Sequence, residues 1–193
     1  NKLENTIKDG AAGYVREKNL QKGKNVIIIE TAKKYVERVI ELDQLELKKG
    51  NRIEIISVEE KFDIEIGEER KKYRLKGKID RIDKINDELR IIDYKTGKKI
   101  YKKELILNSI ENIKKKESIY NLQLLIYMIA MYKKHGYKDI KCGIVCLKNM
   151  KQGVLEGKFG GNLKLKEKEL KKYENEIILL INEIHDINIA LSN

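Results

Sequence analysis

The stretch "KGKIDRIDKINDELRIIDYK", residues 76–95, has the pattern of two strands joined by a tight turn. We interpret residues 73–85 and 89–95 as two strands with "NDE" between them. We take Asn86 and Asp87 as the central turn residues, because Asn and Asp tolerate the positive φ that such turns require. The sequence therefore predicts an antiparallel hairpin with a defined register.

This register places two acids opposite each other. Ile85 faces Glu88, and further from the turn Asp80 faces Asp93. Residues two apart share a face of a strand, so Lys95 lies on the face that holds both acids. Two carboxylates about 5 Å apart repel each other by roughly 3 kcal/mol at an effective dielectric constant near 20.

A divalent cation between the two acids would reverse this repulsion. Mg²⁺ needs few carboxylates from a protein, because it retains several waters, and one pair of aspartates is a sufficient anchor. A different register or one protonated acid would also remove the repulsion. An ordinary half-exposed hairpin with surface charges is the alternative without a site.

The rest of the chain alternates between helical and strand patterns. Apolar spacing and breakers predict helices over 25–47 and 119–134 and from 166 onward, strands over 52–66 and 140–147, and a hairpin around 153–161. Ser118 is the expected N-cap of the second helix, and Gly136 its end. Residues 1–23 specify little structure.

The order helix, three strands, helix, strand predicts an α/β fold of mixed type. Three consecutive strands favour an antiparallel meander, and the strand–helix–strand passage favours a crossover to a parallel strand. We expect one domain over residues 1–193, with a core at about 25–148 and a C-terminal hairpin and long helix over 149–193. Because the sequence begins at Asn1 rather than Met, we expect a fragment of a longer chain.

The composition favours a polyanionic partner. The formal net charge is +11 and the pI about 9.4, which fits nucleic acid binding. No apolar run approaches the length of a membrane span. Cys142 and Cys146 are too few for a disulfide framework or a tetrahedral metal site, so we interpret them as buried hydrophobic residues of a protein in reducing cytoplasm.

The apolar segment "NLQLLIYMIA" carries two polar groups on one helix face. Gln123 and Tyr127 are four residues apart and therefore neighbours on a helix. Burying an unpaired glutamine amide costs about 1 to 3 kcal/mol, so Gln123 should have a partner. Either it is a satisfied core glutamine, or both side chains point toward the carboxylate site.

These motifs resemble those of a known family. "GKIDRID", then "IIDYKTGKK", then "QLLIY" is similar to the PD-(D/E)xK nuclease superfamily, and more closely to the RecB/AddB-type nuclease domains attached to helicases in DNA break processing. The likeness is best over residues 50–148. It implies a restriction-endonuclease-like core of order αβββαβ, with a mixed central sheet flanked by helices. It also implies DNA as substrate, and a helicase region or helicase–nuclease subunits as partners.

The resemblance also implies roles for individual residues. Asp80, Asp93 and the backbone carbonyl of Tyr94 would ligate Mg²⁺, with Mn²⁺ as the other option. Lys95 would position or activate the attacking water and stabilise charge on the phosphate. Gln123 and Tyr127 would orient Lys95 or the DNA backbone.

A glutamate of the first core strand often contributes to such sites. Glu59 or Glu60 would fill that place, and only one of them can reach it, because successive strand residues face opposite ways.

Two features depart from the family pattern. Its members usually have a histidine ligand on an upstream helix, and neither His135 nor His185 fits that place. A histidine upstream of a truncated chain would explain this. With two cysteines, no iron–sulfur cluster is expected in this chain.

The leading hypothesis is a Mg²⁺-dependent DNA nuclease domain of a helicase–nuclease or DNA-repair protein. The alternatives are a weak or inactive nuclease-like module that binds DNA or docks a partner, and a basic α/β protein without a site.

Overall fold

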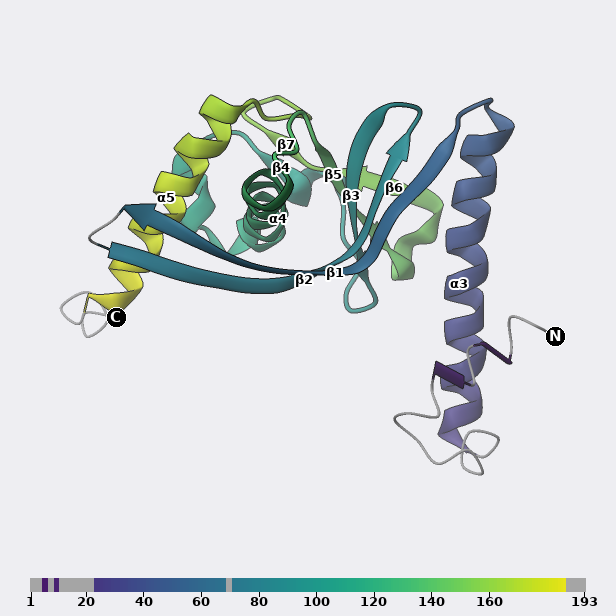
Figure 1. The fold of residues 1–193 in the computed structure, drawn as a ribbon. Helices are drawn as coiled ribbons and strands as arrows, with labels where there is room; N and C mark the ends of the chain where they lie inside the picture. The colour runs from purple at the N-terminus through teal and green to yellow at the C-terminus, as the bar shows by residue number, and fades with distance from the viewer. Residues whose placement is uncertain (1–4, 7–8, 11–22, 69–70, 187–193) are drawn as a thin grey trace. The chain divides into compact units, whose positions relative to one another are not determined.

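The computed structural model describes residues 5–6, 9–10, 23–68 and 71–186 (Figure 1). The chain divides into two compact units, Asn1–Asn51 and Arg52–Asn193. The candidate site residues all lie in the second unit. The single domain expected over residues 1–193 remains a prediction. None of the helices in the described ranges is long and apolar enough to cross a membrane.

The first unit holds one long helix, α3 (Lys24–Lys48), close to the predicted bounds 25–47. Its end is marked by Gly50, which has a φ of 85°. The backbone N–H of Asn51 then turns back to the carbonyl of Glu46 at 3.1 Å. Most of the predicted segment 1–23 lies outside the described residues.

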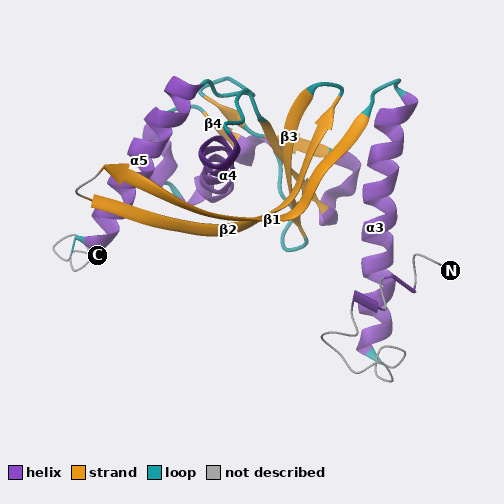
Figure 2. Cartoon of the chain, in the orientation of Figure 1, coloured by secondary structure: helices purple, strands orange, loops and turns teal. Residues whose placement is uncertain are grey.

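The second unit is built on a five-stranded mixed sheet with the order β1-β2-β3-β5-β6 (Figure 2). Its strands are β1 (Ile53–Glu68), β2 (Lys71–Ile85), β3 (Glu88–Lys95), β5 (Lys141–Cys146) and β6 (Val154–Glu156). The pair β3/β5 is parallel, and the other neighbouring pairs are antiparallel. The predicted meander and parallel crossover are confirmed.

The helices α4 (Ile119–His135) and α5 (Glu167–His185) pack on one side of the long β1–β2 arm. Figure 1 shows both above this arm. In β1, Phe62, Ile64 and Ile66 point to the helices and are buried, while the residues between them are exposed. The two-residue period of the strand thus supplies one apolar face to a core that α4 completes with Leu124 and Met128.

Gly77 is required by a close approach between strands. The ring of Phe62 lies over this position, and a Cβ built on Gly77 would be 2.4 Å from the Phe62 Cζ atom. Real Cβ contacts are never this short. The glycine that opens "GKIDRID" therefore makes room for a core aromatic ring.

The register of the β2–β3 hairpin is confirmed. Ile85 pairs with Glu88, and the turn residue Asn86 has a φ of 57°. The Asn86 Oδ1 atom accepts a hydrogen bond from the backbone N–H of Arg52 at 2.9 Å, and its own N–H donates to the Arg52 carbonyl at 2.7 Å. The turn is thereby fixed to the start of β1.

One local prediction is wrong, and another holds only in part. No hairpin forms around residues 153–161: β6 pairs with β5, whereas β7 (Lys158–Phe159) pairs in parallel with β4 (Ile106–Leu107). Gly157 separates them and donates its N–H to the Cys142 carbonyl at 2.9 Å. Ser118 is the N-cap residue of α4, as predicted, but its side chain makes no capping bond, because its Oγ donates to the Asn112 carbonyl at 2.7 Å.

The lysine-rich connection before α4 is not a plain loop. It contains three short 3₁₀ turns, η1 (Lys102–Leu105), η2 (Ile110–Lys114) and η3 (Lys116–Ser118). Leu105, Ile110 and Ile113 anchor these turns in the core.

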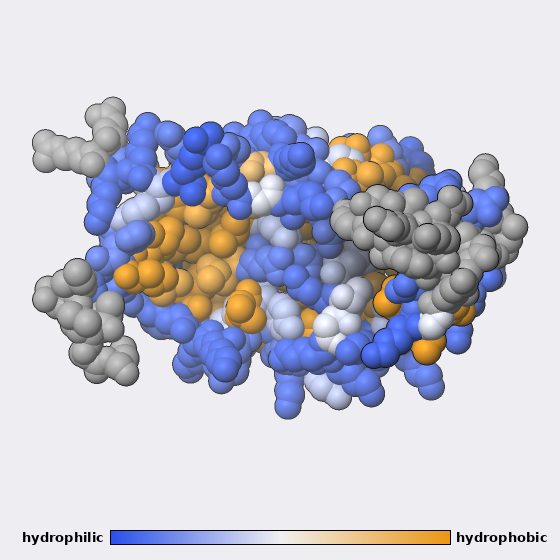
Figure 3. Space-filling model, turned by 90° about the horizontal axis from the view of Figure 1, so that it is seen from below, coloured by the Kyte–Doolittle hydropathy of each residue, from blue (hydrophilic) through white to orange (hydrophobic). Residues whose placement is uncertain are grey.

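Polar and apolar surfaces are unevenly distributed. In the view from below, hydrophobic side chains reach the surface on the left, in the part that holds the β1–β2 arm and α5, and hydrophilic residues surround them (Figure 3).

Candidate active site

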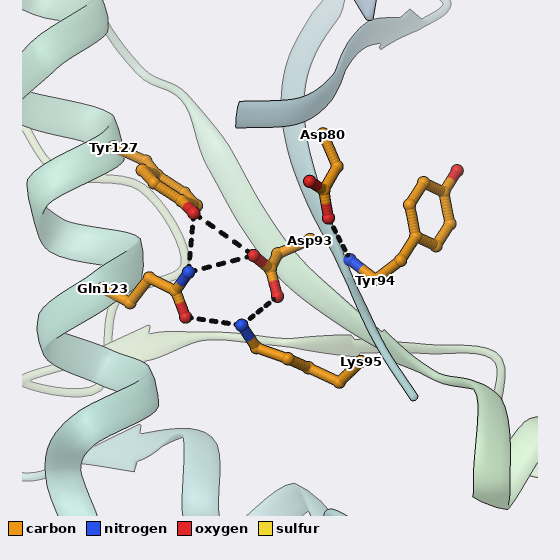
Figure 4. A network of polar contacts seen from close by, with 6 residues as sticks. All are labelled: Asp80, Asp93, Tyr94, Lys95, Gln123 and Tyr127. Carbon is orange, nitrogen blue, oxygen red and sulfur yellow. Dashed lines mark hydrogen bonds and ion pairs between the residues drawn. The ribbon is translucent and has the colours of Figure 1, made fainter. Parts of the chain in front are cut away.

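The backbone pairing between β2 and β3 ends just before the two predicted acids, Asp80 and Asp93. The last paired residues of β2 and β3 are Arg81 and Ile92. The next residue of β2 is Asp80, and its Oδ2 atom accepts a hydrogen bond at 2.8 Å from the backbone N–H of Tyr94, two residues past Ile92 (Figure 4). The Asp80 side chain thus bonds to the β3 backbone just beyond the end of the ladder.

Asp93 is buried in the middle of the sheet. It lies on β3, between β2 and β5, opposite Ile144 of β5, and is 2% exposed. The Lys95 Nζ atom lies 2.9 Å from the Asp93 Oδ2 atom. The expectation that these two side chains share a sheet face is confirmed.

The helix α4 supplies the other half of the site. The Gln123 Oε1 atom accepts a hydrogen bond from Lys95 Nζ at 2.8 Å. The Gln123 Nε2 atom is 3.1 Å from Asp93 Oδ1 and 2.6 Å from the Tyr127 hydroxyl oxygen. That hydroxyl lies 3.3 Å from the same Asp93 oxygen. The half-buried Gln123 thus has a partner, as predicted, and that partner is the Asp93–Lys95 pair, as Figure 4 shows.

The charged form of Asp93 is disfavoured by its surroundings, apart from the neighbouring Lys95 ammonium. Burial raises the pKa of Asp93, the Lys95 ammonium opposes that rise, and the negative charge of Asp80 adds to it. Burial also raises the pKa of the Tyr127 hydroxyl to about 12, so that this group stays protonated at neutral pH. The two aspartates are close enough to act on each other.

The donor set fits a hard divalent cation. Asp80 and Asp93 supply carboxylate oxygens, and Tyr94 connects Asp93 to Lys95 in the chain and offers a backbone carbonyl oxygen. Among the described residues, no cluster of three or more His, Cys, Asp or Glu side chains is placed to hold a metal. A pair of aspartates with few protein ligands matches Mg²⁺, which retains water, better than Zn²⁺.

The two candidate glutamates of β1 have other partners. Glu59, with a φ of 56°, forms an ion pair with Lys78 of β2. Glu60 lies 2.5 Å from Lys134 Nζ and 3.3 Å from His135 Nε2, at the C-terminal end of α4. The structure does not bring either glutamate into contact with the network of Figure 4.

Neither histidine is near the two aspartates. His135 stacks on Tyr137, and His185 stacks on Tyr73. Cys142 and Cys146 are both buried, as expected for small hydrophobic residues.

Sequence reasoning missed a second polar cluster on the same hairpin. Asp83, which is 0% exposed, accepts two bonds from Arg90, at 2.9 Å from Nε and 2.8 Å from Nη2. The Arg81 Nε atom lies 2.7 Å from Asp83 Oδ2. The predicted register, in which Asp80 faces Asp93, also places Asp83 opposite Arg90. The sequence therefore already indicated this second pair.

Comparisons with known proteins identify the family of this chain. The model of the PD-(D/E)XK nuclease superfamily matches residues 3–192. A solved structure titled "Crystal structure of SSO0001" is 17% identical, with a TM-score of 0.34 over 94% of this chain and 85% of that one. No curated protein matches the chain. With its mixed sheet flanked by helices, the chain belongs to the PD-(D/E)XK nuclease superfamily.

Proposed function

We propose that this chain is a Mg²⁺-dependent DNA nuclease domain of the RecB/AddB type, and that it works as part of a helicase–nuclease or DNA-repair protein. The observation that carries the proposal is the single network in which β3 and α4 hold Asp93, Lys95 and Gln123 within hydrogen-bonding distance. Membership of a nuclease superfamily makes phosphodiester hydrolysis the natural use of this network.

Asp80, Asp93 and the carbonyl of Tyr94 would hold the cation. When bound, it would supply a water of lowered pKa and neutralise charge on the phosphate. Lys95 carries a fixed positive charge beside that place, and would orient the water and stabilise the charge that develops on the phosphate oxygens.

Gln123 and Tyr127 are positioning residues in this proposal. The Gln123 carbonyl holds the Lys95 ammonium at 2.8 Å, and its amide N–H bonds to the carboxylate that would bind the cation. Tyr127 supports that amide from one helical turn further along. The lysine thus keeps one direction, which an unsupported four-carbon side chain would not.

A cleavage assay tests the proposal. The purified chain is incubated with labelled DNA in Mg²⁺, in Mn²⁺ and in chelator. We expect cleavage only with the metals, and loss of cleavage in Asp93→Asn. The matched control is Asp87→Asn, because Asp87 is an exposed aspartate of the same hairpin and bonds only across the surface to Arg52. Undiminished cleavage by Asp93→Asn would refute the proposal.

A second candidate function is a nuclease-like module that binds DNA without cutting it. The observation in its favour is that Asp93 is already bonded by Lys95, Gln123 and Tyr127. Calorimetric titration with Mg²⁺ separates the two functions. DNA affinity that is the same with and without chelator, together with no heat of metal binding, would favour the module.

A further inference from the structure

A cavity in the second unit shares no residue with the network of Figure 4. Its volume is about 280 Å³, and it lies where η2, the turn after β7 and the first two turns of α5 meet. The lining residues that decide its chemistry are Glu111, Phe159, Asn162, Glu169, Lys172 and Tyr173. The proposed hydrolysis makes no use of this cavity.

The buried polar group of this cavity is Tyr173. It is 6% exposed, and its ring packs edge-on against the Phe159 ring, with 6.1 Å between the ring centres. Within the described ranges, its hydroxyl forms no hydrogen bond. Burial and the charges of Glu169 and Glu111 raise the pKa of this hydroxyl, so its oxygen lies within electrostatic reach of both acids that line the cavity. A buried hydroxyl is costly without a bonding partner, which indicates that the cavity holds one.

The charged residues of the cavity are two carboxylates and one ammonium, in a chain whose net charge is +11. Glu169 is fixed in place, because its Oε2 atom accepts a hydrogen bond from the Lys166 N–H at 2.9 Å and its Oε1 atom one from Asn162 Nδ2 at 3.2 Å. Glu111 is exposed and has no hydrogen bond or ion pair within the described part of the chain. The cavity is therefore locally acidic in a basic protein, and a cation suits it better than an anion.

The acceptors of the cavity match a planar cation that donates several hydrogen bonds. A guanidinium group has five N–H donors in a rigid fork, has no acceptor, and is more weakly hydrated than an ammonium group. The two carboxylates accept charge-assisted hydrogen bonds, and the Tyr173 oxygen can accept another. The Phe159 and Tyr173 rings supply the aromatic surface on which guanidinium groups pack. Cavities for drug-sized molecules begin at about 300 Å³, so this one suits a group the size of a side chain.

We propose that this cavity binds an alkylguanidinium group, held between the carboxylates of Glu111 and Glu169 and the hydroxyl oxygen of Tyr173. This chemistry is shared by small guanidinium compounds and by the arginine side chain of a partner protein. The cavity is a second site, because none of its residues belongs to the proposed nuclease network. Its ligand binds whether or not the chain cleaves DNA.

Amide NMR titrations test this inference. Gly160 and Glu169 line the cavity, so their N–H signals report its occupation in every variant. The probes are butylguanidinium, butylammonium, inorganic phosphate and N-acetylarginine methylamide. We expect saturable shifts with butylguanidinium, at least fivefold weaker binding of butylammonium, which has fewer donors, and no binding of phosphate. Tighter binding of the arginine derivative than of butylguanidinium supports a partner side chain as the ligand, and the reverse order supports a small molecule.

Variants identify the groups that bind. Glu111→Gln should weaken butylguanidinium binding about fivefold or more, and Tyr173→Phe about threefold or more, since a charged acceptor contributes more than a neutral one. Lys172→Gln should strengthen binding about twofold, because it removes a positive charge from the cavity wall. The matched control is Glu117→Gln, which changes an exposed glutamate of η3 outside the cavity and should leave the affinity unchanged.

The inference is overturned if Glu111→Gln and Glu117→Gln bind butylguanidinium equally well, if Lys172→Gln weakens the binding, or if phosphate shifts the same signals. Glu111 is exposed, so its variant tests the inference even if Tyr173→Phe proves unfolded in urea titration. None of these measurements involves cleavage, so this inference and the proposed function can fail separately.

Discussion

The two aspartates of the motif "DRID" should have different roles: Asp80 is needed for cleavage, and Asp83 for stability. Asp83 is 0% exposed, accepts two hydrogen bonds from Arg90, and forms an ion pair with Arg81 at 2.7 Å. Replacing Arg90 by Met keeps much of the side-chain volume and removes the two-bonded partner of a buried carboxylate. Asp80 is only partly buried and bonds to a backbone N–H at 2.8 Å.

Breaking a buried ion pair by removing one partner costs about 3–5 kcal/mol. Because Arg81 still contacts Asp83, we expect the lower part of that range for Arg90→Met, about 3 kcal/mol. For a chain of this size that lowers the melting temperature by roughly 6–12 °C. Asp80→Asn should change the unfolding free energy by less than about 1 kcal/mol and abolish cleavage.

Urea unfolding followed by circular dichroism measures the first effect, and the DNA cleavage assay measures the second. The control is Arg52→Met, which breaks an exposed ion pair between the start of β1 and Asp87 of the hairpin turn and should cost less than about 1 kcal/mol. If Arg90→Met is as stable as Arg52→Met, or if Arg90→Met loses cleavage while fully folded, the assignment of Asp83 to stability is wrong.

Three further outcomes follow from the same contacts. Gln123→Leu should lower kcat about tenfold to a hundredfold with little change in KM, because it frees Lys95, and cleavage kinetics at saturating DNA check this. Gly77→Ala should lower the unfolding free energy by about 1 to 3 kcal/mol, since its Cβ meets the Phe62 ring, and urea titration measures this. The raised pKa of Asp93 means that the folded state holds its proton more firmly than the unfolded state. Without metal, the unmodified chain should therefore lose stability relative to Asp93→Asn as the pH rises from the ordinary aspartate pKa through the raised pKa of Asp93. Urea unfolding at a series of pH values measures this difference.

The strand pairing and the grouping of the site residues could be predicted from local sequence rules, and the structure follows these rules. Asn86 can adopt a positive φ, and a two-residue turn fixes which residues face each other. Once Asn86 is placed in the turn, the pairing brings Asp80, Asp93 and Lys95 close together. The partner of Gln123 could be anticipated as well, because a buried amide in an apolar helix needs one.

The failures concern segments where local patterns compete with packing between elements. Gly153 and Gly161 punctuate the chain like a hairpin, yet the strand between them divides at Gly157 to pair with two separate sheets. Ser118 does occupy the predicted N-cap position of α4, but its hydroxyl donates to the Asn112 carbonyl of the preceding 3₁₀ turns and makes no capping bond. Such choices depend on distant neighbours, which a single sequence does not display.

The division of the network between a strand and a helix has a consequence for biogenesis. Asp93 and Lys95 belong to β3, whereas Gln123 and Tyr127 arrive with α4, after the long segment of 3₁₀ turns. In a nascent or partly unfolded chain, the β2–β3 hairpin can be formed while α4 is not yet docked. The Lys95 ammonium and the Asp93 carboxylate are then exposed to water without their helical partners. In the proposed function, such a chain could cleave DNA only once α4 has docked, because Gln123 and Tyr127 hold the Asp93–Lys95 pair.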